Sequence, residues 1–192
     1  MPTLSATVRR TADVTAAVFP DNTVLCNFAA VRRLDLLEGF LRGRGRWTEA
    51  VAAEALNSSR QLPDLATIHT AGWLGEPIEI DDESAVALVE HLRIDVFGGT
   101  TNRPTKHLGE AQTCFLLRED PTWVGSWWVS DDRDSLEFAR RQGIHTRETI
   151  DIVAGIVADG DLTAGHGLEL MRSMVDAGRT LRLPSTPRDL VL

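Results

Sequence analysis

The expected fold is decided by the stretch Ala16-Ala17-Val18-Phe19-Pro20-Asp21-Asn22-Thr23-Val24-Leu25-Cys26-Asn27-Phe28. Its apolar start predicts a short buried strand, which we extend back to Val14 and end at Phe19. Asn22 and Thr23 are residue types that favour the start of a helix. Apolar residues then recur every three or four positions, which predicts a helix from about Asn22 to Leu41. Asp21 therefore stands where a strand passes into a helix.

An acid in that place has two interpretations. Ligand sites of open α/β sheets gather at the carboxyl ends of the strands, so Asp21 is a candidate metal ligand or catalytic group. Aspartate is also a common helix cap, and a cap needs no function. Other acids at matching places would favour the first interpretation.

The composition indicates one globular domain over residues 1–192, with residues 1–12 as a loose extension. Apolar residues make up 43% of the chain and charged residues 25%, which is ordinary for a soluble protein. We find neither a membrane-spanning run nor a signal-peptide pattern, and expect a cytoplasmic protein. Cys26 and Cys114 lie in apolar helix patterns and are expected to be buried thiols rather than a disulfide.

The net charge of −8 argues against a protein that binds nucleic acid through its overall charge. A local basic patch is still compatible with this net charge. Two loops are basic, and they carry Arg42, Arg44, Arg46 and Arg103, Lys106, His107. Taken singly, these residues are expected to be ordinary solvated charges. Beside an acidic site they would let a phosphate approach carboxylates.

Strand and helix patterns alternate along the rest of the chain. Strands are expected at 46–48, at the end of 71–80, at 125–129 and at 144–146, and further helices at 49–56, 83–92, from 107 onward, 134–142, 149–158 and 165–177. This alternation predicts an α/β fold with parallel strands and helices on both faces. Neither GxGxxG nor GxxxxGK[ST] occurs, so the sequence gives no support for a nucleotide cofactor.

Acids recur at the joints between these elements, at Asp21, Glu110, Asp131 and Asp132, and Glu54 lies on the expected helix at 49–56. Carboxylates brought together repel one another unless a cation neutralises them. Oxygen-only ligands suit Mg²⁺ or Mn²⁺ rather than zinc. A metal held in this way can activate water and stabilise the charge that develops on a phosphodiester.

The pattern resembles the PIN domain family over roughly residues 14–178. The matching segments are Phe19-Pro20-Asp21-Asn22-Thr23-Val24-Leu25-Cys26-Asn27-Phe28, Ala50-Val51-Ala52-Ala53-Glu54-Ala55-Leu56, Leu108-Gly109-Glu110-Ala111-Gln112 and Trp128-Val129-Ser130-Asp131-Asp132-Arg133-Asp134. The resemblance implies a three-layer α/β/α sandwich around a mostly parallel sheet. It also implies a metal-dependent ribonuclease, many bacterial members being toxins of VapBC-type toxin–antitoxin pairs.

Carried over by resemblance, Asp21, Glu54, Glu110 and one of Asp131 or Asp132 would hold Mg²⁺ or Mn²⁺. The family's frequent Thr/Ser-any-Asp pattern favours Asp132, with Asn22 and Ser130 as supporting residues. The metal would orient a water for in-line attack on RNA, and an antitoxin would silence the enzyme. Leu168, Met171 and Met174 on one helix are expected to be core, with a homodimer face as the alternative.

The chain departs from the family at several places. Pro20 replaces a usual hydrophobic residue, Glu110 stands where many members have Asp, and the middle section 61–105 is longer than in a minimal toxin. These departures support an alternative, a PIN-like binding or regulatory module with little or no catalysis. A phosphoryl-transfer aspartate enzyme is disfavoured because Thr23 stands where a second Asp would be needed.

Each acid also has an ordinary structural interpretation. Glu54 would be an exposed helical residue, Glu110 an acid favoured by a helix N-terminus, and Asp131 or Asp132 a helix cap. The five histidines show no ligand spacing. Trp127 and Trp128 are expected to be packing residues rather than platforms for bases.

Overall fold

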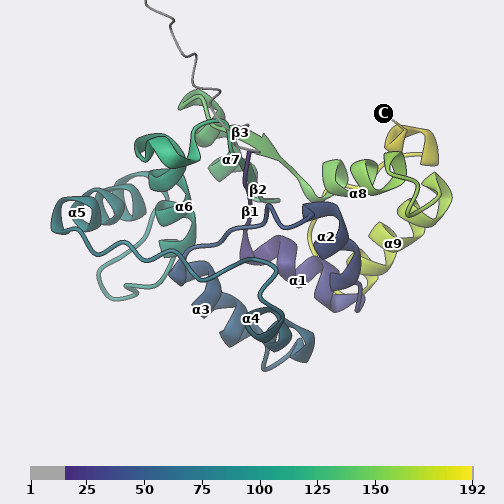
Figure 1. Cartoon of the computed structure of the whole chain (residues 1–192), viewed down its shortest axis with the longest axis horizontal. Helices are drawn as coiled ribbons and strands as arrows, with labels where there is room; N and C mark the ends of the chain where they lie inside the picture. Colours follow the sequence, from purple (N-terminus) through teal and green to yellow (C-terminus); the bar gives the residue numbers. More distant parts are fainter. Residues whose placement is uncertain (1–15, 192) are drawn as a thin grey trace, which may run out of the picture.

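The computed structural model describes residues 16–191, which form a mixed α/β fold (Figure 1). A parallel sheet has the order β1 (Val18–Pro20), β2 (Trp127–Val129) and β3 (His145–Arg147). The nine α-helices of the described residues are α1 (Asn22–Ala30), α2 (Leu34–Leu41), α3 (Glu49–Ser58), α4 (Thr67–Ala71), α5 (Glu83–His91), α6 (Leu108–Glu119), α7 (Arg133–Arg141), α8 (Thr149–Ala158) and α9 (Ala164–Asp176). A π-helical turn, Leu92–Val96, continues α5.

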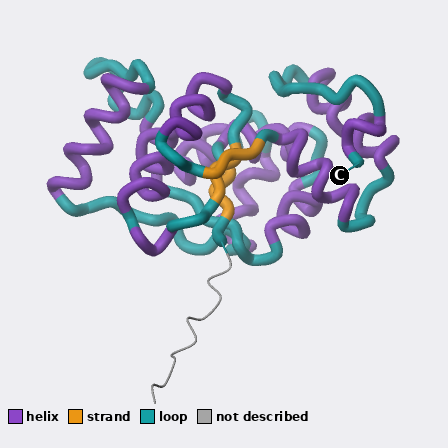
Figure 2. Tube along the Cα trace, turned by 90° about the horizontal axis from the view of Figure 1, so that it is seen from above, coloured by secondary structure: helices purple, strands orange, loops and turns teal. Residues whose placement is uncertain are grey.

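Helices flank this small sheet, which lies in the middle of the molecule when seen from above (Figure 2). Val18 and Val129 pack into one core cluster with residues of α1, α2, α3, α8 and α9. Phe19 and Trp128, their neighbours in the chain, pack into a second cluster with residues of α5, α6 and α7. Successive residues of a strand point to opposite faces, so each face of the sheet has its own core. The predicted α/β class and parallel pairing are thereby confirmed.

The predicted helix from Asn22 to Leu41 is wrong, because the chain breaks it into α1 and α2. Arg32 takes a left-handed conformation with φ of 55°, and the Arg33 amide donates back to the Phe28 carbonyl at 2.9 Å. The apolar spacing continues across the break because both helices bury residues in the same core cluster. Hydrophobic spacing alone therefore could not show the turn.

Two predicted strands, at 46–48 and at the end of 71–80, are also wrong. Gly45 and Thr48 form only isolated bridges, to Val18 and Ile78 respectively. Thr48 accepts a hydrogen bond from the Val51 amide and so begins α3 at once, which leaves no length for a strand. The helices α3 and α5 to α9 and the strands β2 and β3 begin within a few residues of their predicted starts.

The remaining predictions about the chain concern its ends, its cysteines and membranes. Residues 1–12 and Val14 lie outside the described residues. Cys26 and Cys114 are buried free thiols, as predicted. Among the described helices, none combines the length and apolar character that crossing a bilayer requires.

Candidate functional site

Asp21 follows β1 directly, and its carboxylate is not a helix cap. The backbone amide of Asp21 donates to the Val129 carbonyl at 2.8 Å, which fixes the residue beside the end of β2. Its side chain makes no capping hydrogen bond to α1. Instead Oδ2 accepts from the Thr23 hydroxyl at 2.8 Å and from the Ser130 hydroxyl at 3.2 Å. The carboxylate is therefore held in a buried position, 5% exposed, by two neutral donors.

Three acids from three separate elements lie close enough for their charges to act on one another. Burial, followed by the nearby Glu110 carboxylate, raises the pKa of Asp21 to about 6. Burial, with Asp21 and Glu110 as additional causes, raises the pKa of Glu54 to about 8. The structure thus brings Asp21 after β1, Glu54 on α3 and Glu110 on α6 into one acidic cluster.

Gly109 explains how α6 comes so near to α3. A Cβ atom at this position would lie 3.0 Å from Val51 Cγ2 and 3.2 Å from Glu54 Oε1. A larger residue at position 109 would require the Val51 or Glu54 side chain to shift by a few tenths of an ångström, which would disturb the contact between α6 and α3 beside Glu110. The Gly-Glu pair therefore works as a unit, in which glycine permits the approach and glutamate adds the third carboxylate.

The negative charge of the acidic cluster has little compensation. Within residues 16–191, no lysine or arginine forms an ion pair with Asp21, Glu54 or Glu110. The one basic partner there is His107, whose Nδ1 lies 3.1 Å from Glu110 Oε1. Buried carboxylates that face one another without cations destabilise a fold, so this arrangement is unfavourable as a purely structural feature.

The donor chemistry of the cluster fits Mg²⁺ or Mn²⁺, both of which prefer carboxylate oxygens. No group of three or more His, Cys, Asp or Glu among residues 16–191, however, already stands in a geometry that could hold an ion. Glu110 instead turns one oxygen toward His107. The residues suited to a metal are therefore present and near one another, without forming a ready-made coordination shell.

Asp131, predicted as a possible metal ligand, is engaged elsewhere. Its Oδ1 accepts from the Thr149 amide at 3.0 Å. Its Oδ2 accepts from Asn27 Nδ2 at 2.7 Å and from the Thr149 hydroxyl at 2.6 Å. Burial raises the pKa of Asp131, and these hydrogen bonds oppose the rise. Asp131 fastens the start of α8 to α1, and nothing in these contacts joins it to the acidic cluster.

Asp132, the preferred member of that pair, caps α7. Its Oδ1 accepts from the Ser135 amide at 2.7 Å, and the residue is exposed. Asp132 is connected to the acidic cluster only indirectly, through Ser130. The Ser130 hydroxyl accepts a hydrogen bond from the Asp132 amide at 3.2 Å and donates one to Asp21. Asp132 also lines, with His107, a cavity of about 560 Å³. The structural interpretation given above for this acid is thus the one observed.

The two supporting residues have different surroundings. Ser130 is fully buried and contacts Asp21 directly. Asn22 turns away, and its Nδ2 donates to Ser58 Oγ at the end of α3 at 3.2 Å. The sequence indicates Thr23 only as a helix-start residue and His107 only as part of a basic loop, although each contacts an acid within three residues of it in the chain.

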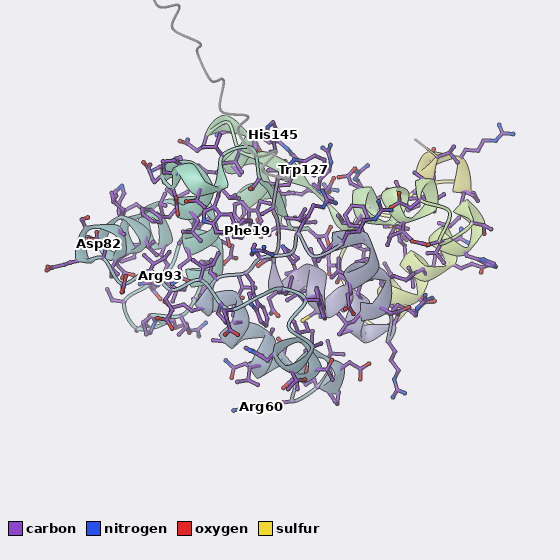
Figure 3. The ribbon with its side chains drawn as sticks, in the orientation of Figure 1. Phe19, Arg60, Asp82, Arg93, Trp127 and His145 are labelled. Atoms are coloured by element: carbon purple, nitrogen blue, oxygen red, sulfur yellow. The ribbon has the colours of Figure 1, made fainter. Side chains whose placement is uncertain are left out.

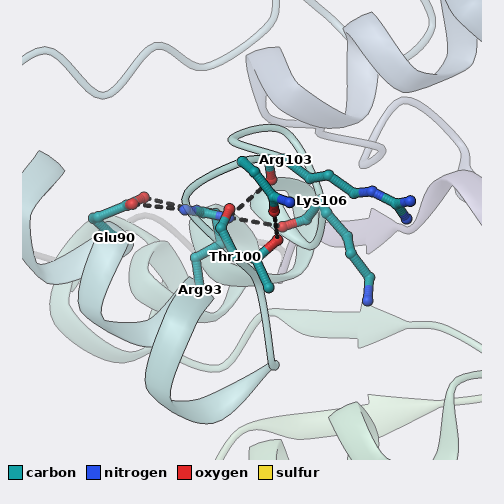
Figure 4. Close-up of polar contacts among 6 residues, drawn as sticks. Glu90, Arg93, Thr100, Arg103 and Lys106 are labelled. Atoms are coloured by element: carbon teal, nitrogen blue, oxygen red, sulfur yellow. Dashed lines mark hydrogen bonds and ion pairs between the residues drawn. The ribbon is translucent and has the colours of Figure 1, made fainter.

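The basic loop before His107 is shaped by a buried arginine, Arg93 (Figure 4). Its guanidinium donates to the carbonyls of Thr100, Arg103 and Lys106 at 3.1 to 3.4 Å and pairs with Glu90 at 2.6 Å. The loop is thereby closed around one side chain. Its fixed end carries His107, which reaches Glu110.

No family model matches the chain, and no curated protein or solved structure shows significant similarity to it.

Proposed function

We propose that the chain is a metal-dependent endoribonuclease with a PIN-like fold, and that Asp21, Glu54 and Glu110 hold Mg²⁺ or Mn²⁺. The observation that carries the proposal is the cluster of three buried or half-buried carboxylates, for which residues 16–191 provide no lysine or arginine partner. Such a cluster becomes favourable when a divalent cation neutralises it. Asp131 and Asp132 are left out of the proposed site because their carboxylates serve other contacts.

The PIN-like part of the proposal concerns architecture. Helices on both faces of a parallel sheet are compatible with a three-layer α/β/α sandwich, and Asp21 follows the first strand as the resemblance implies. The sheet is small, with strands of three residues each. Because of that size, the family assignment is part of the proposal.

Different residues of the chain would have different roles at the proposed site. Thr23 and Ser130 hold the Asp21 carboxylate in place, and Gly109 keeps Glu110 beside Glu54. Glu54 keeps its proton near neutral pH in the metal-free protein, so binding of a cation would release it. A bound Mg²⁺ or Mn²⁺ supplies a water activated for attack and neutralises charge on the phosphate.

An RNA cleavage assay with Mn²⁺ tests this function. Asp21→Asn and Glu54→Gln should each reduce cleavage by about 100-fold or more, because each removes a charged ligand. Asp176→Asn, at an exposed position on α9, is the matched control and should cleave like the wild type. Equal cleavage by the wild type and Asp21→Asn would rule out this site.

A toxin of this kind would act on RNA in the cytoplasm and would need an antitoxin to silence it, and we include that partner in the proposal. The alternative of a homodimer through one stripe of α9 has no support, because Leu168, Met171 and Met174 are buried in the chain's own core. Reading the neighbouring gene for a small DNA-binding protein would test the partner.

One observation favours a second candidate, a PIN-like binding or regulatory module without turnover. Glu110 contacts His107, and no ready-made coordination shell exists among residues 16–191. Calorimetry with Mn²⁺ combined with the RNA assay separates the two functions. Metal binding together with cleavage supports the nuclease, whereas metal binding without cleavage supports the module.

A further inference from the structure

Two adjoining cavities at the other end of the sheet are lined by arginines. The larger, of about 690 Å³, is bordered by Arg42, Arg44 and Arg46, and by Ala17 and Ser126, which precede β1 and β2. The smaller, of about 360 Å³, shares Arg42 and Arg44 and adds Arg147 from β3. Together these four arginines line one continuous surface, which we call the arginine surface.

The arginine surface is separate from the acidic cluster. Ala17 lies before β1 and Asp21 lies after it, so the extended chain between them spans roughly 13 Å. None of the residues lining the two cavities belongs to the acidic cluster. The arginine surface therefore needs its own explanation.

The loop that carries three of these arginines is held in a fixed shape. Arg46 donates to the Gly43 carbonyl at 3.0 Å, and Arg44 Nε donates to the Leu41 carbonyl at 3.3 Å. A Cβ at Gly45 would lie 2.5 Å from a Leu74 methyl carbon, so glycine is needed there for the loop to pass. These bonds use only part of each guanidinium, so both arginines keep further N–H donors where they line the cavity.

Positive charge exceeds negative charge on the arginine surface, although the whole chain has a net charge of −8. The acids that line the two cavities are Asp151 and Asp159. Asp159 forms an ion pair with Arg42 at 3.0 Å, and Asp151 accepts a hydrogen bond from the Glu148 amide at 2.8 Å. Arg44, Arg46 and Arg147 have no carboxylate partner within the described part of the chain. An anion is the ligand that this charge would attract.

Two tryptophans stand among the arginines, and both are half-buried. Trp123 borders the larger cavity and Trp127 the smaller one. The Arg147 guanidinium carbon lies 4.3 Å from the centre of the ring of Trp127, the first residue of β2, which is labelled in Figure 3. Indole rings and stacked guanidinium planes are surfaces on which unpaired bases stack, while free guanidinium groups bind phosphates.

We propose that the arginine surface binds single-stranded nucleic acid, with phosphates on Arg44 and Arg46 and a base against Trp127 and Arg147. Single-stranded chains fit because their bases are free to stack, whereas a duplex keeps its bases paired inside. Cavities of a few hundred Å³ suit a nucleotide. This binding goes beyond the proposed nuclease, because it needs neither the acidic cluster nor a metal.

Fluorescence anisotropy with a labelled single-stranded RNA of about twelve nucleotides tests the proposal. EDTA is present throughout, so that metal-dependent cleavage cannot contribute. Arg44→Gln/Arg46→Gln should weaken binding by about tenfold or more and lower the salt dependence, because two phosphate contacts are lost. Arg147→Gln and Trp127→Leu, which leave the loop intact, should each weaken it by about fivefold or more.

Arg60→Gln is the matched control, since Arg60 is exposed in the turn after α3, far from Trp127 (Figure 3). It should bind RNA like the wild type. Undiminished binding by Arg147→Gln and by the double variant would overturn the proposal. Equal displacement of the RNA by a duplex or by a glutamate-rich peptide of the same charge would also overturn it, because the surface would then recognise charge alone. Wild-type protein that binds the RNA in this assay but does not cleave it when Mn²⁺ is added would contradict only the proposed nuclease.

Discussion

Asp21 and Asp131 stand just beyond the ends of neighbouring strands, yet their surroundings are opposite. Asp131 accepts three hydrogen bonds from Asn27 and Thr149, so its half-buried charge is well satisfied. Asp21 accepts two hydroxyls and faces two further carboxylates. Asp131 therefore stabilises the fold, whereas Asp21 belongs to a cluster of like charges that destabilises the metal-free protein.

The comparison teaches how to separate a structural acid from a functional one. Position after a strand is shared by both, so position cannot distinguish them. The two acids differ in the groups around their carboxylates. Hydrogen-bond donors surround the Asp131 carboxylate, whereas the Asp21 carboxylate faces other negative charges. Unfavourable electrostatics that persist in a folded protein are typical of binding sites. Substitutions of Asp131, Glu54 and Asp132 test this difference.

Removing the satisfied acid should destabilise the protein most. Asp131→Ala leaves the Thr149 amide without its acceptor and removes one of the two acceptors of Asn27 Nδ2, and should lower the free energy of unfolding by about 3 kcal/mol. Chemical denaturation of the metal-free protein measures the change. Asp134→Ala, an exposed acid in the first turn of α7, is the comparison and should cost about 1 kcal/mol or less. Equal losses from both variants would contradict a structural role for Asp131.

Neutralising an opposed acid should instead stabilise the metal-free protein. The pKa of Glu54 rises from 4.5 to about 8 on folding, so between these pH values the folded state retains a proton that the unfolded state has lost. Stability from this group is therefore present below pH 4.5 and is lost as the pH rises toward 8. Glu54→Gln removes that loss and should raise the free energy of unfolding at pH 8 by about 2 kcal/mol, discounted because the side chain is partly exposed.

The same measurement at pH 4 supplies the internal control for Glu54. There both folded and unfolded chains carry the proton, and the variant should match the wild type. Glu38→Gln, on an exposed part of α2, should change little at either pH. A Glu54→Gln protein that is less stable than the wild type at pH 8 would contradict the description of the acidic cluster as unfavourable.

Asp132 should show the smallest effect and should separate a cap from a ligand. Asp132→Ala loses the hydrogen bond to the Ser135 amide and should destabilise the protein by about 1 kcal/mol. Asp132→Ser, which can cap as well, should restore most of that stability while leaving Mn²⁺ affinity unchanged. A drop in Mn²⁺ affinity for Asp132→Ser as large as for Asp21→Asn would show that Asp132 is a ligand after all.

The sequence could predict what depends on local pattern. Alternating apolar segments gave the α/β class, and spacing placed α8 and α9 within one residue of their observed bounds. The prediction that Asp21, Glu54 and Glu110 lie together combined their places along the expected strands and helices with a resemblance, and the structure does bring them near one another. The metal itself, RNA cleavage and the toxin role stay predictions.

What the sequence could not show depends on partners far along the chain. Asp131 is engaged by a hydrogen bond from Asn27, which lies 104 residues away in the chain. No pattern in the sequence around Asp131 indicates this contact. The break between α1 and α2 rests on Arg32, a residue that rarely takes a left-handed conformation. The arginine surface joins a loop after α2 to β3 and to the segment before β2, and only the folded chain shows that these adjoin.

Titration calorimetry of the folded chain with Mn²⁺ tests whether carboxylates from three elements share one divalent cation. The wild type should bind one ion per chain and release protons near pH 7, because Glu54 is protonated before the ion enters. Asp21→Asn and Glu54→Gln should lose about 1.4 kcal/mol or more of binding free energy, a tenfold change, whereas Asp176→Asn should not. Mn²⁺ binding of the same strength in all four proteins, or none in the wild type, would contradict the account.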